Sequence, residues 1–192
     1  MGDHKRRFKR WHGKQTGRRK YLVDLILEQI VPRFEQEGFC WHRDFAGGDI
    51  QQVANSTIPL QRREGSFWPT VEIIFDRRNR PAFQVNFALL PPNCRRWTEN
   101  GWKDVSQIEA ALVDGPAVFY LCGTNRWTTN LFGYLYFSLF PKRRLRSDVA
   151  SLAELLPELF AVLNSGELEM KTDDSEPTST WRLLMAIPGK YT

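Results

Sequence analysis

Apolar residues recur at three- and four-residue spacing from Lys20 onward, in the rhythm of a helix with one buried face. Leu22 and Ile26 lie on that face, and acidic residues fill the other, so the pattern predicts an amphipathic helix of about 18 residues. Pro32 is expected to kink or break this helix, because its ring clashes with the preceding turn. Gly38 is expected to end it in a left-handed conformation.

The segments after this helix have the alternation typical of half-buried strands. In Ala82 to Leu90, every second residue is apolar and faces one side, while Gln84 and Asn86 face the other. Thr70 to Phe75 is rich in β-branched residues, and the turn over 76–81 predicts a hairpin with the strand that follows. Shorter or less regular strands are expected within 39–43, 50–60, 117–122, 131–140 and 180–187.

The last third of the chain predicts a helix over Leu152 to Leu163. Ser151, followed by Glu154, has the spacing of a capping box, and Pro157 is expected to restart a helix at its first turn. The run Lys142 to Arg146 is interpreted as a charged connector. Asn93 to Gly101 is expected to be a loop, and Val105 to Leu112 a short helix.

These elements indicate an α+β fold, with an antiparallel sheet and helices packed mainly on one face. The strands pair locally and lack the regular alternation with helices of a parallel sheet. We expect residues 19–192 to form this single domain, because 192 residues are enough for one core and too few for two comfortable ones.

Residues 1–18 are expected to form a flexible basic arm. Residues 1–20 carry nine Lys and Arg against Asp3, whereas the rest of the chain carries 18 against 21 acidic residues. The net charge of +5 therefore comes from the N-terminal segment. Such a segment is either a solvated tail or an electrostatic contact with nucleic acid through residues 1–20 or with an acidic partner.

Motifs for catalysis, metals and cofactors are not found. The three Cys form no CxxC pair, and no zinc, calcium, dinucleotide or phosphate-loop signature occurs. His42 is expected to be the only imidazole in the folded part, with a structural role. We therefore predict no catalytic residue, no metal and no cofactor. The chain also lacks a secretory signal and a run of about 20 apolar residues, so a cytoplasmic protein without a membrane segment is expected.

Arginine and tryptophan residues supply the candidate binding site. Arg next to Trp occurs at protein interfaces and at single-stranded nucleic-acid sites, and guanidinium groups bind phosphates and carboxylates in pairs of hydrogen bonds. The alternative is that the charges are solvated turn residues beside core aromatics. The candidate residues are Arg77, Arg78, Arg80, Arg95, Arg96, Trp97, Trp102, Arg126 and Trp127.

Residues 20–92 resemble a family of bacterial α+β domains of unknown function. The resemblance is carried by the helix that ends in Gly38-Phe39, by Ile50 to Val53, and by Gln84-Val85-Asn86-Phe87. It implies an α+β fold without established catalytic residues, and a role of the kind suspected for immunity proteins or toxin-associated modules.

Three classes of function stay open at the level of sequence. The leading hypothesis is a non-enzymatic binding or protein-interaction module, because aromatic and basic residues are abundant and a catalytic set is missing. The second is a nucleic-acid-associated protein that uses its basic N-terminal arm. The third is an enzyme of unknown class, with a site of Arg, acidic residues and His42.

Overall fold

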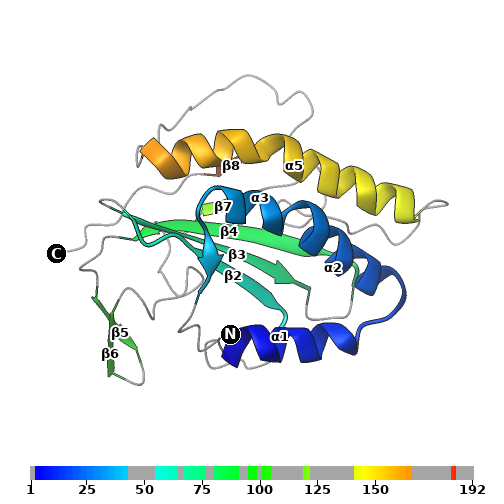
Figure 1. Cartoon of the computed structure of the whole chain (residues 1–192), viewed down its shortest axis with the longest axis horizontal. Coiled ribbons are helices and arrows are strands. Elements are labelled where there is room, and N and C mark those ends of the chain that lie inside the picture. The colour runs from blue at the N-terminus through cyan, green and yellow to red at the C-terminus, as the bar shows by residue number, and fades with distance from the viewer. Residues whose placement is uncertain are drawn as a thin grey trace.

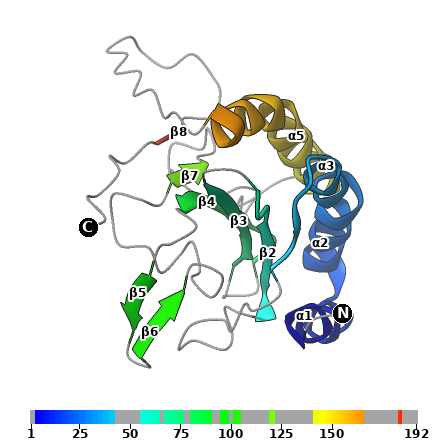
Figure 2. The same cartoon turned by 60° about the vertical axis from the view of Figure 1, so that its left-hand side comes forward.

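The computed structural model describes residues 3–42, 55–64, 67–76, 80–90, 95–98, 101–104, 119–121, 141–165 and 183–184. Within them, a six-stranded sheet runs in the order β1-β2-β3-β4-β7-β8, and every neighbouring pair is antiparallel. Four helices lie on one face of this sheet (Figures 1 and 2), so the predicted α+β fold is confirmed. The strands are β1 (Cys40–Trp41), β2 (Thr57–Gln61), β3 (Trp68–Phe75), β4 (Phe83–Leu90), β7 (Phe119–Leu121) and β8 (Leu183–Leu184).

The β3–β4 hairpin is the centre of the sheet and confirms the clearest local prediction. Its register pairs Trp68 with Leu90 at one end and Phe75 with Phe83 at the other. Pro91 follows the last residue of β4, as expected of a residue that cannot donate to the ladder. Strands were also correctly expected around β1, β2, β7 and β8. The expectations for 50–54, 105–112 and 131–140 lie outside the described residues.

The loop that the sequence predicts over residues 93–101 is partly wrong. Residues 95–98 were expected to be part of a loop over 93–101, but they form β5 (Arg95–Thr98), which pairs antiparallel with β6 (Gly101–Asp104). The alternation that identifies longer strands is hard to see in four residues, which explains the error. The β5–β6 hairpin is a separate two-stranded sheet that lies apart from the helices in Figure 2.

The amphipathic helix predicted from Lys20 onward is present, and it is divided into two helices near Pro32, as expected. α2 (Gly17–Gln29) ends at Ile30, and α3 (Val31–Gln36) follows with Pro32 in its first turn. Proline is tolerated there because the first N–H groups of a helix have no intrahelical acceptor. Gly38 takes φ +80 after α3, a conformation that is strained for residues with a side chain. The chain then turns into β1.

The expected flexible arm is instead a packed helix over most of its length. α1 (Asp3–Gly13) places His4 and Phe8 in the protein interior, with exposed fractions of 2% and 1%. The Phe8 ring lies 5.4 Å from Trp41 and 6.3 Å from Phe75, and His4 Nε2 donates to the carbonyl of Thr57 at 3.0 Å. The basic residues of the segment are therefore carried by a folded element.

The C-terminal helix begins earlier than predicted and is continuous. α5 (Pro141–Ser165) includes the run 142–146 that was interpreted as a connector. Proline at its first position has a backbone angle that favours helix initiation. Ser151 lies in the middle of the helix and is not a cap, and Pro157 lies inside the helix and does not start one. The predicted end at 164–166 is confirmed by the last helical residue, Ser165.

The core lies between the sheet and the four helices. Alternate residues of β3 and β4 face the helices, and Val71, Ile73 and Phe75 oppose Phe87, Val85 and Phe83 in the register. Burying these side chains supplies the main favourable free energy of folding. The helices contribute Phe8, Leu22, Val23, Ile26, Ile30, Phe34, Leu145, Val149, Leu152, Leu156, Leu159 and Leu163 to the same cluster.

Candidate functional site

The predicted Arg and Trp residues are not gathered into one described site. Arg77, Arg78, Arg126 and Trp127 lie outside the described residues. Arg80 follows the hairpin turn, where its guanidinium donates to the carboxylate of Asp76. Arg95, Arg96 and Trp97 belong to β5 and Trp102 to β6, and the register places Trp97 opposite Trp102. Within the described residues, this hairpin is the one element that brings predicted residues together.

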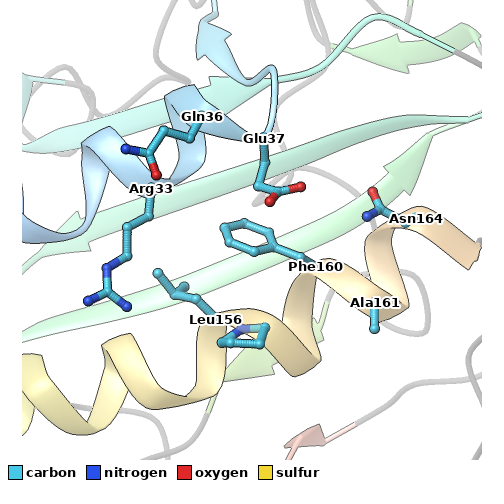
Figure 3. Close-up of a pocket in the computed structure, with 8 residues that line it drawn as sticks. Arg33, Gln36, Glu37, Leu156, Phe160, Ala161 and Asn164 are labelled. Carbon is cyan, nitrogen blue, oxygen red and sulfur yellow. The ribbon is translucent and has the colours of Figure 1, made fainter.

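A groove lies on the surface between α3 and α5. Its volume is about 560 Å³, within the range of roughly 300–1,000 Å³ that is typical of ligand sites. On α5 its residues follow helical spacing, so they form one stripe (Figure 3). The groove is lined by Arg33 and Gln36 of α3, by Glu37, which directly follows α3, and by Leu156, Pro157, Phe160, Ala161 and Asn164 of α5.

Phe160 is the aromatic residue of the groove, and its ring is held by two others. Its centroid lies 5.1 Å from that of Phe34 at an interplanar angle of 86°. It also lies 6.4 Å from the ring of Phe39. Edge-to-face packing of this kind is favourable beyond the area that it buries. The ring therefore has a defined position, with part of its surface accessible from the groove.

Arg33 connects α3 to α5 through a backbone carbonyl that Pro157 leaves without a donor in its own helix. Proline has no N–H, so the carbonyl of Ala153, four residues earlier, loses its intrahelical donor. The Nη1 group of Arg33 donates to that carbonyl at 3.0 Å. A break in the hydrogen bonding of one helix is thus filled by a side chain of the other.

Arg62, which directly follows β2, makes a second connection at the other end of the groove. Its Nη1 donates to the carbonyl of Glu37 at 3.2 Å, and its Nη2 donates to Oδ1 of Asn164 at 2.7 Å. Its guanidinium carbon also lies 5.2 Å from the centre of the Phe39 ring. Arg33 and Arg62 together hold α3 against α5, so the groove is formed before any ligand arrives.

The groove carries a small excess of negative charge, because the exposed carboxylates of Glu37, Glu154 and Glu158 outnumber the guanidinium groups of Arg33 and Arg62. The Arg33 guanidinium is bound to a carbonyl, whereas the carboxylate of Glu37 has no ion-pair partner among the described residues. Glu154 and Glu158 are exposed on the same part of α5. The groove therefore presents an aromatic ring, two side-chain amides and a local excess of carboxylates.

The other face of the sheet carries buried polar residues that the analysis of the sequence did not select. Glu72 and Asn86 are paired across β3 and β4, with exposed fractions of 1% and 2%. On the neighbouring strand, Gln61 Nε2 donates to Oγ1 of Thr70 at 3.0 Å. Their signal was the alternation itself, because polar residues take every second position in strands whose other positions are apolar. Gln84 Nε2 likewise donates to Oδ1 of Asn86 at 3.3 Å, so polar side chains of this face bind one another.

The histidines do not form a common site. His4 and His12 belong to the packed helix α1, so the expectation that His42 is the only imidazole of the folded part is wrong. His12 Nε2 lies 2.8 Å from a carboxylate oxygen of Asp24, while His4 bonds to a backbone carbonyl. His42 is buried, and its backbone N–H donates to the carbonyl of Pro59 at 3.0 Å. Each imidazole therefore has a different environment.

Neither a metal-binding cluster nor a membrane-spanning helix is found within the described ranges. Among those residues, no group of three or more His, Cys, Asp or Glu side chains is arranged to hold a metal ion. None of the helices in the same ranges combines the length and apolar character that crossing a membrane requires.

Comparisons with protein-family models, curated proteins and solved structures found no match for this chain. The resemblance of residues 20–92 to a bacterial family therefore stays a prediction. The function has to be argued from the residues themselves.

Proposed function

We propose that this protein is a non-enzymatic interaction module that binds a short basic peptide segment of a partner protein in the groove between α3 and α5. The observation that carries the proposal is the preformed groove of about 560 Å³, with Phe160 exposed to it and two arginines holding its sides together. A volume of this size accommodates a few residues of an extended peptide or one turn of a helix.

The rigidity of the groove supports binding. Association is weakened by the free energy needed to order the two surfaces, and this cost is smaller when one surface is already ordered. Arg33 and Arg62 fix α3 and α5 through hydrogen bonds that do not involve the ligand. An apolar side chain of the partner can then pack on Phe160, Leu156 and Pro157 without rearranging the helices.

The charge of the groove supports a basic partner. Glu37 lines the groove, and its carboxylate is available for a Lys or Arg of the peptide. The amide group of Gln36 offers donors and an acceptor to the backbone of an extended segment. Asn164, whose Oδ1 accepts from Arg62, offers the donors of its Nδ2 group. We therefore expect the recognised sequence to contain one large apolar residue with Lys or Arg nearby.

The experiment is a selection from a phage-displayed library of twelve-residue peptides against the full chain, followed by affinity measurements on the selected peptides. We expect a consensus that combines an apolar residue with Lys or Arg. Ala161→Arg, which fills the groove, should weaken binding by at least about tenfold, or 1.4 kcal/mol. Ala150→Arg is the matched control, because it adds the same side chain on the same helix outside the groove.

A variant that reverses the charge of Glu37 distinguishes binding in the groove from general electrostatic attraction to the protein. Glu37→Lys should weaken binding of the selected peptides, whereas Glu28→Lys on α2 should change it little. An acidic consensus, equal effects of the two Arg variants, or a selection without enrichment would each overturn the proposal. Thermal unfolding of each variant confirms that the groove helices stay folded.

A further inference from the structure

A second surface of the helical layer, which comprises α1, α2, α3 and α5, is strongly basic. We call it the basic end. It consists of the exposed cations of α1, of the start of α2 and of the first turns of α5 (Figure 1). Its exposed residues are Arg6, Lys9, Arg10, Lys14, Arg18, Lys20, Lys142, Arg143, Arg144 and Arg146.

Contacts around Tyr21 join the two parts of the basic end, which are far apart in the sequence. The ammonium group of Lys142 lies 5.4 Å from the centre of the Tyr21 ring, and the guanidinium carbon of Arg146 lies 5.6 Å from it. Arg146 Nε also donates to the Tyr21 hydroxyl. The cations of α5 are therefore held beside those at the start of α2. The end of α1 is joined to α2 by His12, whose Nε2 lies 2.8 Å from a carboxylate oxygen of Asp24.

Among the side chains that the structure describes, two carboxylates lie within this surface, and both are already engaged. Asp24 accepts from Lys20 at 2.7 Å and lies 2.8 Å from His12, while Asp148 lies 3.2 Å from Arg144. Among the described residues, no ion pair is made by Lys9, Arg10, Lys14, Arg18 or Arg143. Concentrated like charge of this kind destabilises the free protein, and a bound anion reverses that effect.

The extent of the surface indicates a polymeric anion. α1 alone has 11 residues, which corresponds to a length of about 16 Å at the usual helical rise. A single small anion would contact only a few of these cations. A chain of phosphates can contact cations from all three elements, and guanidinium groups bind phosphate oxygens in pairs of hydrogen bonds.

The packing of α1 favours nucleic acid over a lipid surface. An amphipathic helix that binds a membrane inserts its apolar face among the lipids. In this protein the apolar face of α1 is used internally, because Phe8 is buried and the Trp11 ring lies 5.6 Å from that of Phe75. What α1 presents outward is charge.

We propose that the basic end binds the phosphodiester backbone of a nucleic acid, with cations of α1, α2 and α5 contacting successive phosphates. This function is independent of the groove, because the two surfaces share no residue. It also replaces the idea of a detached arm, since the binding surface requires α1 to be folded and α5 to be in place.

The test is fluorescence anisotropy with a labelled 30-base-pair DNA duplex and, in a parallel arm, a 30-nucleotide single-stranded RNA, each over a series of salt concentrations. The two arms show which source supplies the phosphates. We expect binding to fall steeply with salt. Lys142→Gln with Arg143→Gln should weaken it about tenfold at low salt and reduce the slope of log affinity against log salt by about 1.8.

A control with the same change in net charge distinguishes a site from overall attraction. Gln29→Glu with Ser165→Glu also lowers the net charge by two, at positions outside both the basic end and the groove. This pair should weaken binding less than twofold. Equal weakening by the two pairs, failure to bind either nucleic acid, or tighter binding to vesicles of anionic lipid would overturn the proposal.

Discussion

At the groove end of the helical layer, formed by α3 and the second half of α5, arginine side chains are bound to backbone carbonyls. At the basic end, most of them face the solvent. Arg33 and Arg62 donate to the carbonyls of Ala153 and Glu37, respectively. Arg10, Arg18 and Arg143 are exposed, and none of them has an ion-pair partner among the described residues. The same residue type thus stabilises one end and leaves the other charged.

The two ends treat arginine differently because they expose different backbone groups. Pro157 frees a carbonyl at the groove end, and a free carbonyl is an acceptor for arginine. The first turn of a helix offers N–H groups instead, and α5 begins with cations and no acidic residue in its first turn. Cations at that position are unfavourable with the helix dipole. Arg144 and Arg146 have partners within the protein, whereas Arg143 has no ion-pair partner among the described residues and is better explained by binding.

The largest expected effect tests whether the basic end is folded. Phe8→Ala should lower the free energy of unfolding by about 3–5 kcal/mol, because a buried aromatic ring is lost and a cavity remains. It should also speed tryptic cleavage in residues 5–10. Chemical denaturation and limited proteolysis provide the two measurements, with the exposed Lys9→Ala as control. A Phe8→Ala effect below about 1 kcal/mol would contradict the packing of α1.

A smaller effect tests the structural role of arginine at the groove end. Arg33→Met keeps most of the side-chain stem and removes the guanidinium, so the carbonyl of Ala153 loses its donor. We expect a loss of about 1–2 kcal/mol in the free energy of unfolding. Arg143→Met at the basic end should change it by less than about 0.5 kcal/mol. Equal effects from urea denaturation would remove the contrast between the two ends.

The smallest effect concerns the carboxylates of the basic end. Burial raises the pKa of Asp148 to about 6, although Arg144 acts in the opposite direction. Between pH 4 and 6 the folded protein therefore holds a proton that the unfolded chain has released, so stability falls as pH rises through this window. Asp148→Asn should be more stable by about 1 kcal/mol at pH 8, a value reduced for solvent screening, with no difference below about pH 4.

For Asp24, the expected dependence of stability on pH is the opposite of that for Asp148. Burial acts to raise its pKa, but the hydrogen bonds from Lys20 and His12 outweigh this and lower it. Asp24→Asn should therefore destabilise the protein at neutral pH, and the loss should disappear in acid. Thermal unfolding measured from pH 2 to 8 checks both variants, and the same sign for both would contradict the two environments.

Local patterns predicted the parts of the fold that depend on near neighbours. The break at Pro32, the turn at Gly38 and the β3–β4 hairpin each follow from a few adjacent residues. The class of fold followed from the order of these elements. These features could be predicted because the physical cause lies within one turn or one pair of strands.

The predictions for α1 and for the start of α5 were wrong for the same reason. In both segments, dense charge obscured a short stripe of apolar residues. His4, Phe8 and Trp11 have helical spacing in α1, but their partners Trp41 and Phe75 are distant in the sequence. In α5, Leu145 and Val149 continue the spacing of Leu152 toward the N-terminus, within a run of cations. Dense charge suggests a tail only when no buried stripe accompanies it.

The groove could not be predicted, because it depends on how distant elements meet. Phe160 was recognisable as an apolar helical residue, but its partner Phe34 belongs to another helix. The donor for the carbonyl left by Pro157 comes from α3, and nothing near Pro157 in the sequence indicates it. The predicted binding residues were chosen because Arg and Trp are neighbours in the sequence. A site formed by segments that are distant in the sequence could not be found in this way.

The connection between Arg33 and Ala153 spans 120 residues, and that between Tyr21 and Arg146 spans 125. During synthesis, α2 and α3 therefore emerge long before α5, and the surface of α2 that packs against α5 stays uncovered until the last quarter of the chain is made. Contacts between such distant segments slow folding and prolong the exposure of apolar surface. A chain interrupted before Pro141 would lack both the groove and the basic end. Both proposed binding surfaces thus become available only after translation has passed α5.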